Sequence, residues 1–459
     1  MNKLTAKKII AIVTSLIMYI ISPRGVDVFF QSVSAIMFSL MAIDSIKSDV
    51  KSGVSLSFNL LFYPILFICT YVYPLFIYNT EIEIYFGFHS GYVDEYGNIA
   101  TALVQLAISC YYFTERNDIR VNKANLSKVS NIIPYLAVVD LLAFVCFVIQ
   151  FMSYLQGSQD TNDLADSYLG TISESFIYLS IILRAISFHS NYQNRSFKLF
   201  IRKNLSTIGI LMFIVLGCLY IGDRTVPIFF SCFLLAIISF YVYEIRIKYL
   251  LIFFPIVGLF MYTIGQTRSD SKVSIKDSGM SAYVDATDVI VSNTKSELIF
   301  FSDYTPSTIT LTRSLYLIDN NDSYYYPGKI FVVLASPIPL LPTVLTNLLY
   351  DLPRGEISSA AIITKQYRKA VELGDSGMGT HAVGDLYLSW GLLGVVIGFF
   401  VLGKIMSYSK SHLDSLFQNI IYFTMLSYAL YIPRDTLYLG IRTIFYQFII
   451  YLLLKSIRK

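Results

Sequence analysis

The sequence predicts an all-α polytopic integral membrane protein with about twelve transmembrane helices, and three observations support this class. Of the 459 residues, 55% are hydrophobic and 14% are charged, whereas a soluble protein has roughly 25% charged residues. Apolar runs of about 17 to 25 residues recur along the chain, which is the length that a helix needs to cross a bilayer. The runs are continuous rather than alternating, which excludes an outer-membrane barrel.

Charged residues and breaks at Pro or Gly divide the apolar sequence into twelve predicted spans. They cover residues 5–22, 26–46, 54–78, 97–114, 132–155, 169–188, 205–221, 225–243, 249–265, 383–403, 416–432 and 436–454. The chain therefore divides into spans 1–9 (residues 1–265), one large loop (266–382) and spans 10–12 (383–459). We expect the first run to be a retained span, because no small-residue cleavage site precedes Pro23.

The basic residues predict the orientation of these spans. Lys and Arg gather in alternate connections, at Lys3, Lys7, Lys8, Lys47, Lys51, Arg116, Arg120, Lys123, Lys128, Arg195, Lys198, Arg202, Lys203, Arg246, Lys248, Lys404, Lys410, Lys455, Arg458 and Lys459. By the positive-inside rule these connections and both termini are cytoplasmic. The large loop at 266–382 then lies on the outer side, and its own basic residues carry little weight because long loops cross regardless of charge.

Residues 330–350 inside this loop are apolar, but Pro337, Pro339 and Pro342 interrupt them. Prolines in the interior of a helix break it, so we expect a re-entrant or interface-lying segment rather than a thirteenth span. A re-entrant segment requires a protein-covered or wet cavity beneath the loop. The alternative of a true span would place the C-terminal basic residues outside, against the charge rule.

Single arginines remain in outer turns that otherwise lack cations, at Arg24, Arg224 and Arg434. Arginine binds phosphate in a bidentate manner, so these turns are candidate contacts for a phosphate-bearing ligand. Alternatively, each arginine anchors its helix end by snorkelling or by pairing with a neighbouring aspartate. Arg442 lies about two turns deeper, where a charge is costly and usually faces a cavity. Asp140 inside the fifth span needs a cation or a polar network for the same reason.

The outer loop combines arginines with many aromatic residues. Its arginines include Arg268, Arg313, Arg354 and Arg368, and a tyrosine run covers 324–326. Aromatic rings stack on the apolar faces of sugars and arginines hold phosphates, so the set suits a phosphorylated glycan. A charged loop rich in tyrosine is also compatible with an ordinary solvated domain.

The stretch 377–394, where the chain re-enters the apolar region, places polar groups among small residues at a helix start. Asp385 and Tyr387 fall in the first turn or so of the tenth span. Asp385 is either a catalytic carboxylate or a helix-capping residue, since negative charge is favourable at a helix N-terminus. His381 is either a general base for a hydroxyl, because its ordinary pKa lies near neutrality, or a loop histidine.

The run Gly384-Asp385-Leu386-Tyr387-Leu388-Ser389-Trp390-Gly391 resembles the Gly-acid-x-Tyr-x-x-x-Gly pattern of the O-antigen polymerases, which join bacterial oligosaccharide repeat units. The turn Gly222-Asp223-Arg224 is similar to the Gly-x-Arg turn of that family. The number of spans and the late outer loop also resemble the family. Trp390 stands where many members have Phe, and His381 lies outside the pattern.

The resemblance implies a GT-C-like fold and a metal-independent glycosyltransferase of the bacterial cytoplasmic membrane, without a cofactor. A glycan on polyprenyl diphosphate would pass to a lipid-linked repeat unit at the periplasmic face, with a chain-length regulator as a further partner. The candidate substrate contacts are Arg224, Arg268, Arg313, Arg354, Arg368, Arg434, Arg442 and Tyr387. His381 or Asp385 would serve as the base.

Two other functions fit the same sequence. An O-antigen ligase, which attaches the finished glycan to a lipid core, shares the large outer loop, so topology does not separate it from a polymerase. A lipid-linked oligosaccharide flippase usually has short loops and a central path of intramembrane charge. Nucleic-acid binding has no support, and neither the five cysteines nor the four histidines have metal-site spacing.

Overall fold

A computed structural model describes residues 3–78, 92–115, 121, 123, 132–155, 168–192, 196–220, 223, 225–245, 249, 306–321, 323–370 and 379–456. Every regular element within these residues is a helix, which confirms the predicted all-α class. The elements before residue 250 are α1 (Lys3–Ile20), α2 (Val28–Lys51), α3 (Phe58–Phe67), η1 (Ile68–Ile77), α4 (Val93–Thr114), η3 (Ile133–Tyr135), α5 (Leu136–Leu155), α7 (Tyr168–Asn191), α8 (Phe197–Lys203), α9 (Leu205–Tyr220), α10 (Thr225–Ile237) and η4 (Ile238–Val242). The later elements are α14 (Pro306–Asn321), α15 (Lys329–Leu334), α16 (Leu341–Tyr350), η6 (Arg354–Ile357), α17 (Ser359–Ala370), α18 (Ala382–Ser411), α19 (Leu416–Ser427), η7 (Ile432–Arg434) and α20 (Ile441–Ser456).

Six helical stretches among the described residues are long and apolar enough to cross a membrane. They are Val28–Lys51, Phe58–Ile77, Ile133–Ser153, Tyr168–Asn191, Thr225–Val242 and Ala382–Ser411. The pair α8 and α9, bent by 89°, makes a seventh if it forms one broken span. This set is consistent with an α-helical membrane protein, while twelve spans and their sidedness remain predictions.

The other predicted spans differ from these six for identifiable reasons. α1 carries Lys3, Lys7 and Lys8 within its 18 residues. α4 has 22 residues but begins with Asp94 and Glu95 and continues with further polar side chains. α19 and α20 have 12 and 16 residues, and 16 residues extend only about 24 Å against a hydrocarbon core of about 30 Å. The predicted span 249–265 lies outside the described residues except for residue 249.

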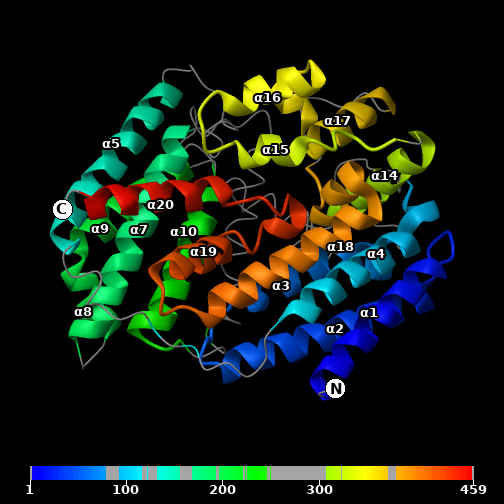
Figure 1. The fold of residues 1–459 in the computed structure, drawn as a ribbon, viewed down its shortest axis with the longest axis horizontal. Helices are drawn as coiled ribbons and strands as arrows, with labels where there is room; N and C mark the ends of the chain where they lie inside the picture. Colours follow the sequence, from blue (N-terminus) through cyan, green and yellow to red (C-terminus); the bar gives the residue numbers. More distant parts are fainter. Residues whose placement is uncertain are drawn as a thin grey trace, which may run out of the picture.

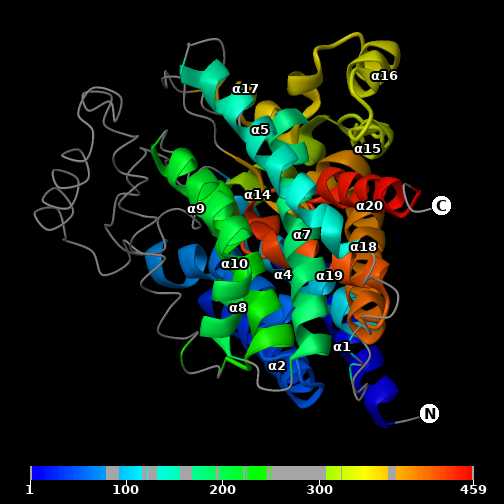
Figure 2. The same cartoon turned by 90° about the vertical axis from the view of Figure 1, so that its left-hand side faces the viewer.

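The helices form two groups that meet along the middle of the molecule (Figure 1). α4 is the centre of one group and packs against α1, α2, α14 and α18. In the other group α7 packs against α5, α9, α10 and α20, and α19 joins the two groups through α10 and α18. In both views α15 and α16 lie together at the upper side of the molecule (Figures 1 and 2), and Figure 1 shows α17 on that side as well.

Part of the expected outer loop lies inside the helix bundle. α14 packs against α4, α18 and η1, and its polar residues Thr308, Thr310, Thr312 and Ser314 are all buried. The Thr308 hydroxyl donates to the Cys69 carbonyl at 2.6 Å, in the π-helical part of the second candidate span. Buried hydroxyls need such partners; Thr308 finds its acceptor in η1, whereas Thr310, Thr312 and Ser314 donate to backbone carbonyls of α14 itself.

The proline-containing segment 330–350 is two short helices, as its sequence requires. α15 ends at Leu334, and α16 begins at Leu341 with Pro342 in its first turn. Proline is favourable in the first turn of a helix and unfavourable in its interior, which explains the break between them.

Asp140 of α5 is paired with a cation of α7. Arg184 of α7 donates to its carboxylate at 2.7 Å, and the hydroxyls of Ser180 and Thr207 donate at 2.6 and 2.7 Å. The buried charge is therefore paired and hydrogen-bonded, as an intramembrane carboxylate requires.

Candidate active site

The Gly384 to Gly391 stretch of α18 attaches the loop helices to the bundle. A Cβ on Gly384 would lie 2.8 Å from the Ser314 hydroxyl, so this glycine permits close contact with α14. α18 then breaks at Gly391, whose φ of 61° and ψ of −147° suit glycine alone. At this break the backbone N–H of Tyr325 donates to the Leu388 carbonyl at 2.8 Å, and the Trp390 indole donates to the Pro327 carbonyl at 2.8 Å.

Asp385 is buried in this attachment and binds two loop residues. Its Oδ1 accepts hydrogen bonds from Lys329 at the start of α15 and, at 2.6 Å, from Ser359 at the start of α17. Its other oxygen has no hydrogen-bond partner within the described part of the chain. Asp385 therefore joins α18 to α15 and α17, and it fixes the position of the Lys329 ammonium.

A cavity of about 470 Å³ lies beside Lys329, between the loop helices and the second group of helices. It is lined by Thr171, Glu174, Thr225, Val226, Phe229, Lys329, Val332, Val333, Ser336, Ile357, Ser358, Tyr428, Tyr431, Asp435, Thr436, Tyr438, Leu439, Gly440, Arg442 and Thr443. The lining combines two cations, two carboxylates, four aromatic rings and many hydroxyls. A pocket of this size, with a few convergent polar groups, is typical of a site for a small molecule or a headgroup.

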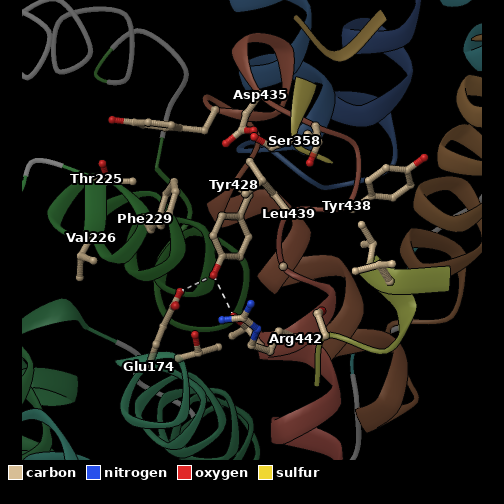
Figure 3. A pocket seen from close by; sticks show the side chains of 18 of the residues that line it. Glu174, Thr225, Val226, Phe229, Ser358, Tyr428, Asp435, Tyr438, Leu439 and Arg442 are labelled. Carbon is tan, nitrogen blue, oxygen red and sulfur yellow. Dashed lines mark hydrogen bonds between the residues drawn. The ribbon is translucent and has the colours of Figure 1, made fainter. Parts of the chain in front are cut away.

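One wall of the cavity brings opposite charges together. Glu174 from α7, Tyr428 after α19 and Arg442 from α20 point toward one another (Figure 3). The Tyr428 hydroxyl donates to Glu174 at 2.8 Å and lies 2.9 Å from the Thr443 hydroxyl. This wall therefore offers a carboxylate proton acceptor next to a permanent cation.

Arg434 and Arg442 lie in or beside the cavity. Arg442 lines it directly, and its guanidinium carbon is 5.0 Å from the centre of the Tyr168 ring. The guanidinium carbon of Arg434 is 5.3 Å from the centre of the Tyr431 ring, and Tyr431 lines the cavity. Stacking on an aromatic face orients a guanidinium, and each of these rings helps to fix the position of a positive charge in or beside the cavity.

His381 does not line the cavity and lies at the start of α18. Its side chain is fully buried, its Nδ1 accepts from the Val383 backbone N–H at 3.1 Å, and its Nε2 lies 3.4 Å from the Thr70 hydroxyl. It is thus the N-cap of α18. Burial lowers the pKa of His381 to about 3, so its ring is neutral near pH 7. This geometry favours a structural role over that of a base.

The remaining predicted residues lie apart from the cavity lining or outside the described residues. Tyr387 faces Tyr19 of α1, on a different side of α18. Arg313 is buried in α14, close to Tyr92. Arg224 and Arg268 lie outside the described residues; Arg354 begins η6 and Arg368 belongs to α17, and only their backbones are described.

The outer-turn arginine Arg24 is paired. It contacts Glu95 at 3.0 Å and Asp319 at 3.4 Å, and all three side chains are well exposed. These bonds join the first connection to the start of α4 and to the end of α14. The anchoring interpretation therefore fits Arg24.

Sequence reasoning did not identify Lys329 and Glu174 as site residues. Glu174 carried a usable signal, because an ionisable residue inside a predicted span is by itself a candidate functional residue. Lys329 had no such signal, because it follows a turn in a loop and gains its partner Asp385 only when the loop folds back.

Among the described residues, no group of three or more His, Cys, Asp or Glu side chains is placed to hold a metal ion. The chain matches no protein-family model, and neither the curated proteins nor the solved structures with which it was compared include a match.

Proposed function

We propose that the protein is a polysaccharide polymerase of the bacterial cytoplasmic membrane, which extends a glycan carried on polyprenyl diphosphate with lipid-linked repeat units. The observation that supports this proposal is the cavity lined by Lys329, Arg442, Glu174 and several tyrosines. Cations suit a diphosphate and aromatic rings suit sugar faces, so the lining matches both parts of such a substrate.

The reaction needs two contributions from the cavity, cations that stabilise the leaving group and a base that accepts a proton. The acceptor hydroxyl oxygen forms a bond to the anomeric carbon of the donor sugar, while the bond from that carbon to the diphosphate oxygen breaks. The diphosphate leaves with the bonding electron pair, and the positive charges of Lys329 and Arg442 stabilise it. The hydroxyl proton passes to Glu174, which Tyr428 orients.

This proposal changes the base that the sequence favoured. Asp385 is held by Lys329 and Ser359 and therefore acts as a positioning residue for the Lys329 cation. His381 caps α18, outside the cavity lining. Glu174 lines the cavity and accepts a hydrogen bond from the Tyr428 hydroxyl.

Deleting the gene and separating the surface glycans by gel electrophoresis tests the proposal. A polymerase deletion should leave single repeat units attached to the lipid, whereas loss of all surface glycan would point to a ligase or a flippase. An unchanged pattern of surface glycans would show that the protein has no role in surface glycan synthesis.

Complementation with variants then tests the cavity itself. We expect Arg442→Ala to abolish long chains while the protein still inserts in the membrane, because the leaving group loses a cation. Arg24→Ala is the matched control, since Arg24 is exposed and contacts Glu95 and Asp319 outside the cavity. Full-length chains with Arg442→Ala would exclude this cavity as the active site.

A further inference from the structure

Helices α15 and α16 present an apolar face that no part of the described chain covers. Its large exposed side chains are Phe331, Leu334, Ile338, Leu340, Val344 and Leu348. Residues 330–350 include no Asp, Glu, Lys or Arg. A contiguous apolar surface of this kind is unusual in contact with water and marks an interaction surface.

Leu340 provides an independent observation on this face. Its backbone is in the left-handed region at a φ of 66°, and its side chain is 76% exposed. This conformation is unfavourable for a bulky L-residue, and glycine or asparagine usually occupies it. A leucine that projects into water gains nothing to offset this cost, whereas a leucine that inserts into an apolar phase does.

The apolar face continues onto a neighbouring helix. The Tyr446 hydroxyl of α20 donates to the Pro337 carbonyl at 2.8 Å, which fixes the α15–α16 connection against α20. α20 itself exposes Leu452 and Leu453. Figures 1 and 2 both show α15 and α16 above α20. The neighbouring helix thus also exposes apolar side chains, in addition to those of α15 and α16.

α15 also has a second face, toward the cavity. Lys329, Val332, Val333 and Ser336 line the cavity, while Phe331 and Leu334 of the same short segment are exposed on the other side. A single helix thus separates the cavity from the surface that carries the apolar side chains.

We propose that α15 and α16 dock into the lipid bilayer at its headgroup–acyl boundary, with Leu340, Val344 and Leu348 inserted. α15 is then the wall between the lipid and the cavity. This part of the inference rests on the proposed function. An amphiphilic substrate can keep its hydrocarbon tail in the lipid on the outer side of α15 while its phosphate-bearing headgroup binds at Lys329.

The test uses the full-length protein reconstituted in phosphatidylethanolamine–phosphatidylglycerol vesicles. An environment-sensitive fluorophore is attached to Leu348→Cys and, as the matched control, to Thr343→Cys, which is exposed on a polar side of the same helix. The background carries Cys146→Ala, because Cys146 is the least buried of the five cysteines. Nitroxide-labelled lipids report contact with the bilayer, and iodide reports contact with water.

We expect nitroxide lipids to quench the probe at 348 several-fold more than the probe at 343, with the opposite order for iodide. Adding Leu340→Gly, which suits the left-handed backbone, should lower the lipid quenching at 348 without unfolding the protein. Equal iodide quenching at both sites would overturn docking. Protection of site 348 from iodide without lipid quenching would also overturn it, because a protein would then cover the face.

Chain growth in cells separates this inference from the proposed function. Leu348→Asp should shorten glycan chains more than Asn347→Asp, because only the first charge enters the bilayer. Lipid quenching at 348 in a protein whose deletion leaves glycan unchanged would support docking and reject the polymerase. Normal chain growth without lipid quenching would support the polymerase and reject docking.

Discussion

Two of the regions in which the described chain buries charged side chains differ in the space around those charges. The closed charge cluster (Lys8, Asp49, Glu115 and Lys410) joins one end of α1, α2, α4 and α18. Its residues Asp49, Glu115 and Lys410 line a space of only about 10 Å³, enough for about one water molecule. The cavity beside α15 also contains cations and carboxylates, around about 470 Å³.

The hydrogen bonds of the two regions also differ in how much space they leave for a ligand. In the closed charge cluster Lys410 donates to Asp49, Lys8 donates to the Glu115 carbonyl oxygen, and Ser45 donates to the Glu115 carboxylate. These bonds cross between helices and leave no room for a ligand. In the cavity the charges of Arg442 and Glu174 lie beside open space. Buried charge is therefore a functional signal only together with accessible volume.

The largest expected effect is that of Glu174→Gln on activity. The substitution keeps the size and a hydrogen-bond acceptor but removes the proton acceptor, so we expect glycan extension by purified, reconstituted protein to fall by roughly 10²–10⁴-fold. The exposed Glu356→Gln serves as the control, because Glu356 forms an exposed ion pair with Lys365 at 3.3 Å and does not line the cavity. Extension at the parental rate with Glu174→Gln would exclude Glu174 as the base.

In the closed charge cluster, Lys410→Met should act on stability instead. It leaves the buried Asp49 carboxylate without its cation, which typically costs about 3–5 kcal/mol. Thermal unfolding in detergent measures the loss, and extension per folded molecule should stay unchanged.

Two variants make this test specific. Adding Asp49→Asn should recover most of the lost stability, since both charges are then gone. Lys404→Met is the matched control on the same helix, because Lys404 is exposed. A folded, stable Lys410→Met protein that fails to extend glycan would mean that the closed charge cluster takes part in function.

The smallest expected effect is the pH dependence that Glu115 gives to stability. Burial, with the neighbouring Asp49, raises the pKa of Glu115 to about 7 from 4.5. A carboxyl with a raised pKa stabilises the folded state fully below pH 4.5, and this contribution is lost as the pH rises through about 7. Glu115→Gln should therefore flatten the decline in Tm between pH 5 and 8 by a few degrees. An unchanged slope would assign the decline to other groups.

The sequence identified residues 384–391 of α18 as a special stretch, but it did not identify the loop residues that bind them. The Gly384 to Gly391 pattern indicated a helix start with a catalytic or capping Asp385, whereas in the structure Asp385 binds residues of α15 and α17. Its partners Lys329 and Ser359 lie 56 and 26 residues away. Neither the catalytic nor the capping interpretation of Asp385 predicted its bonds to Lys329 and Ser359. No local sequence pattern encodes a contact between residues so far apart in the chain.

By itself the sequence determined that the chain folds as apolar helices, where several of them begin and end, and that prolines divide 330–350. These features are local, because a chain in lipid must satisfy its own backbone hydrogen bonds within each segment. Only the tertiary structure decided that α14 is buried, that His381 caps a helix, and that Glu174, Lys329 and Arg442 share one cavity. The physical reason is that such contacts depend on how helices distant in sequence pack, and many packings satisfy the same local hydrogen bonds.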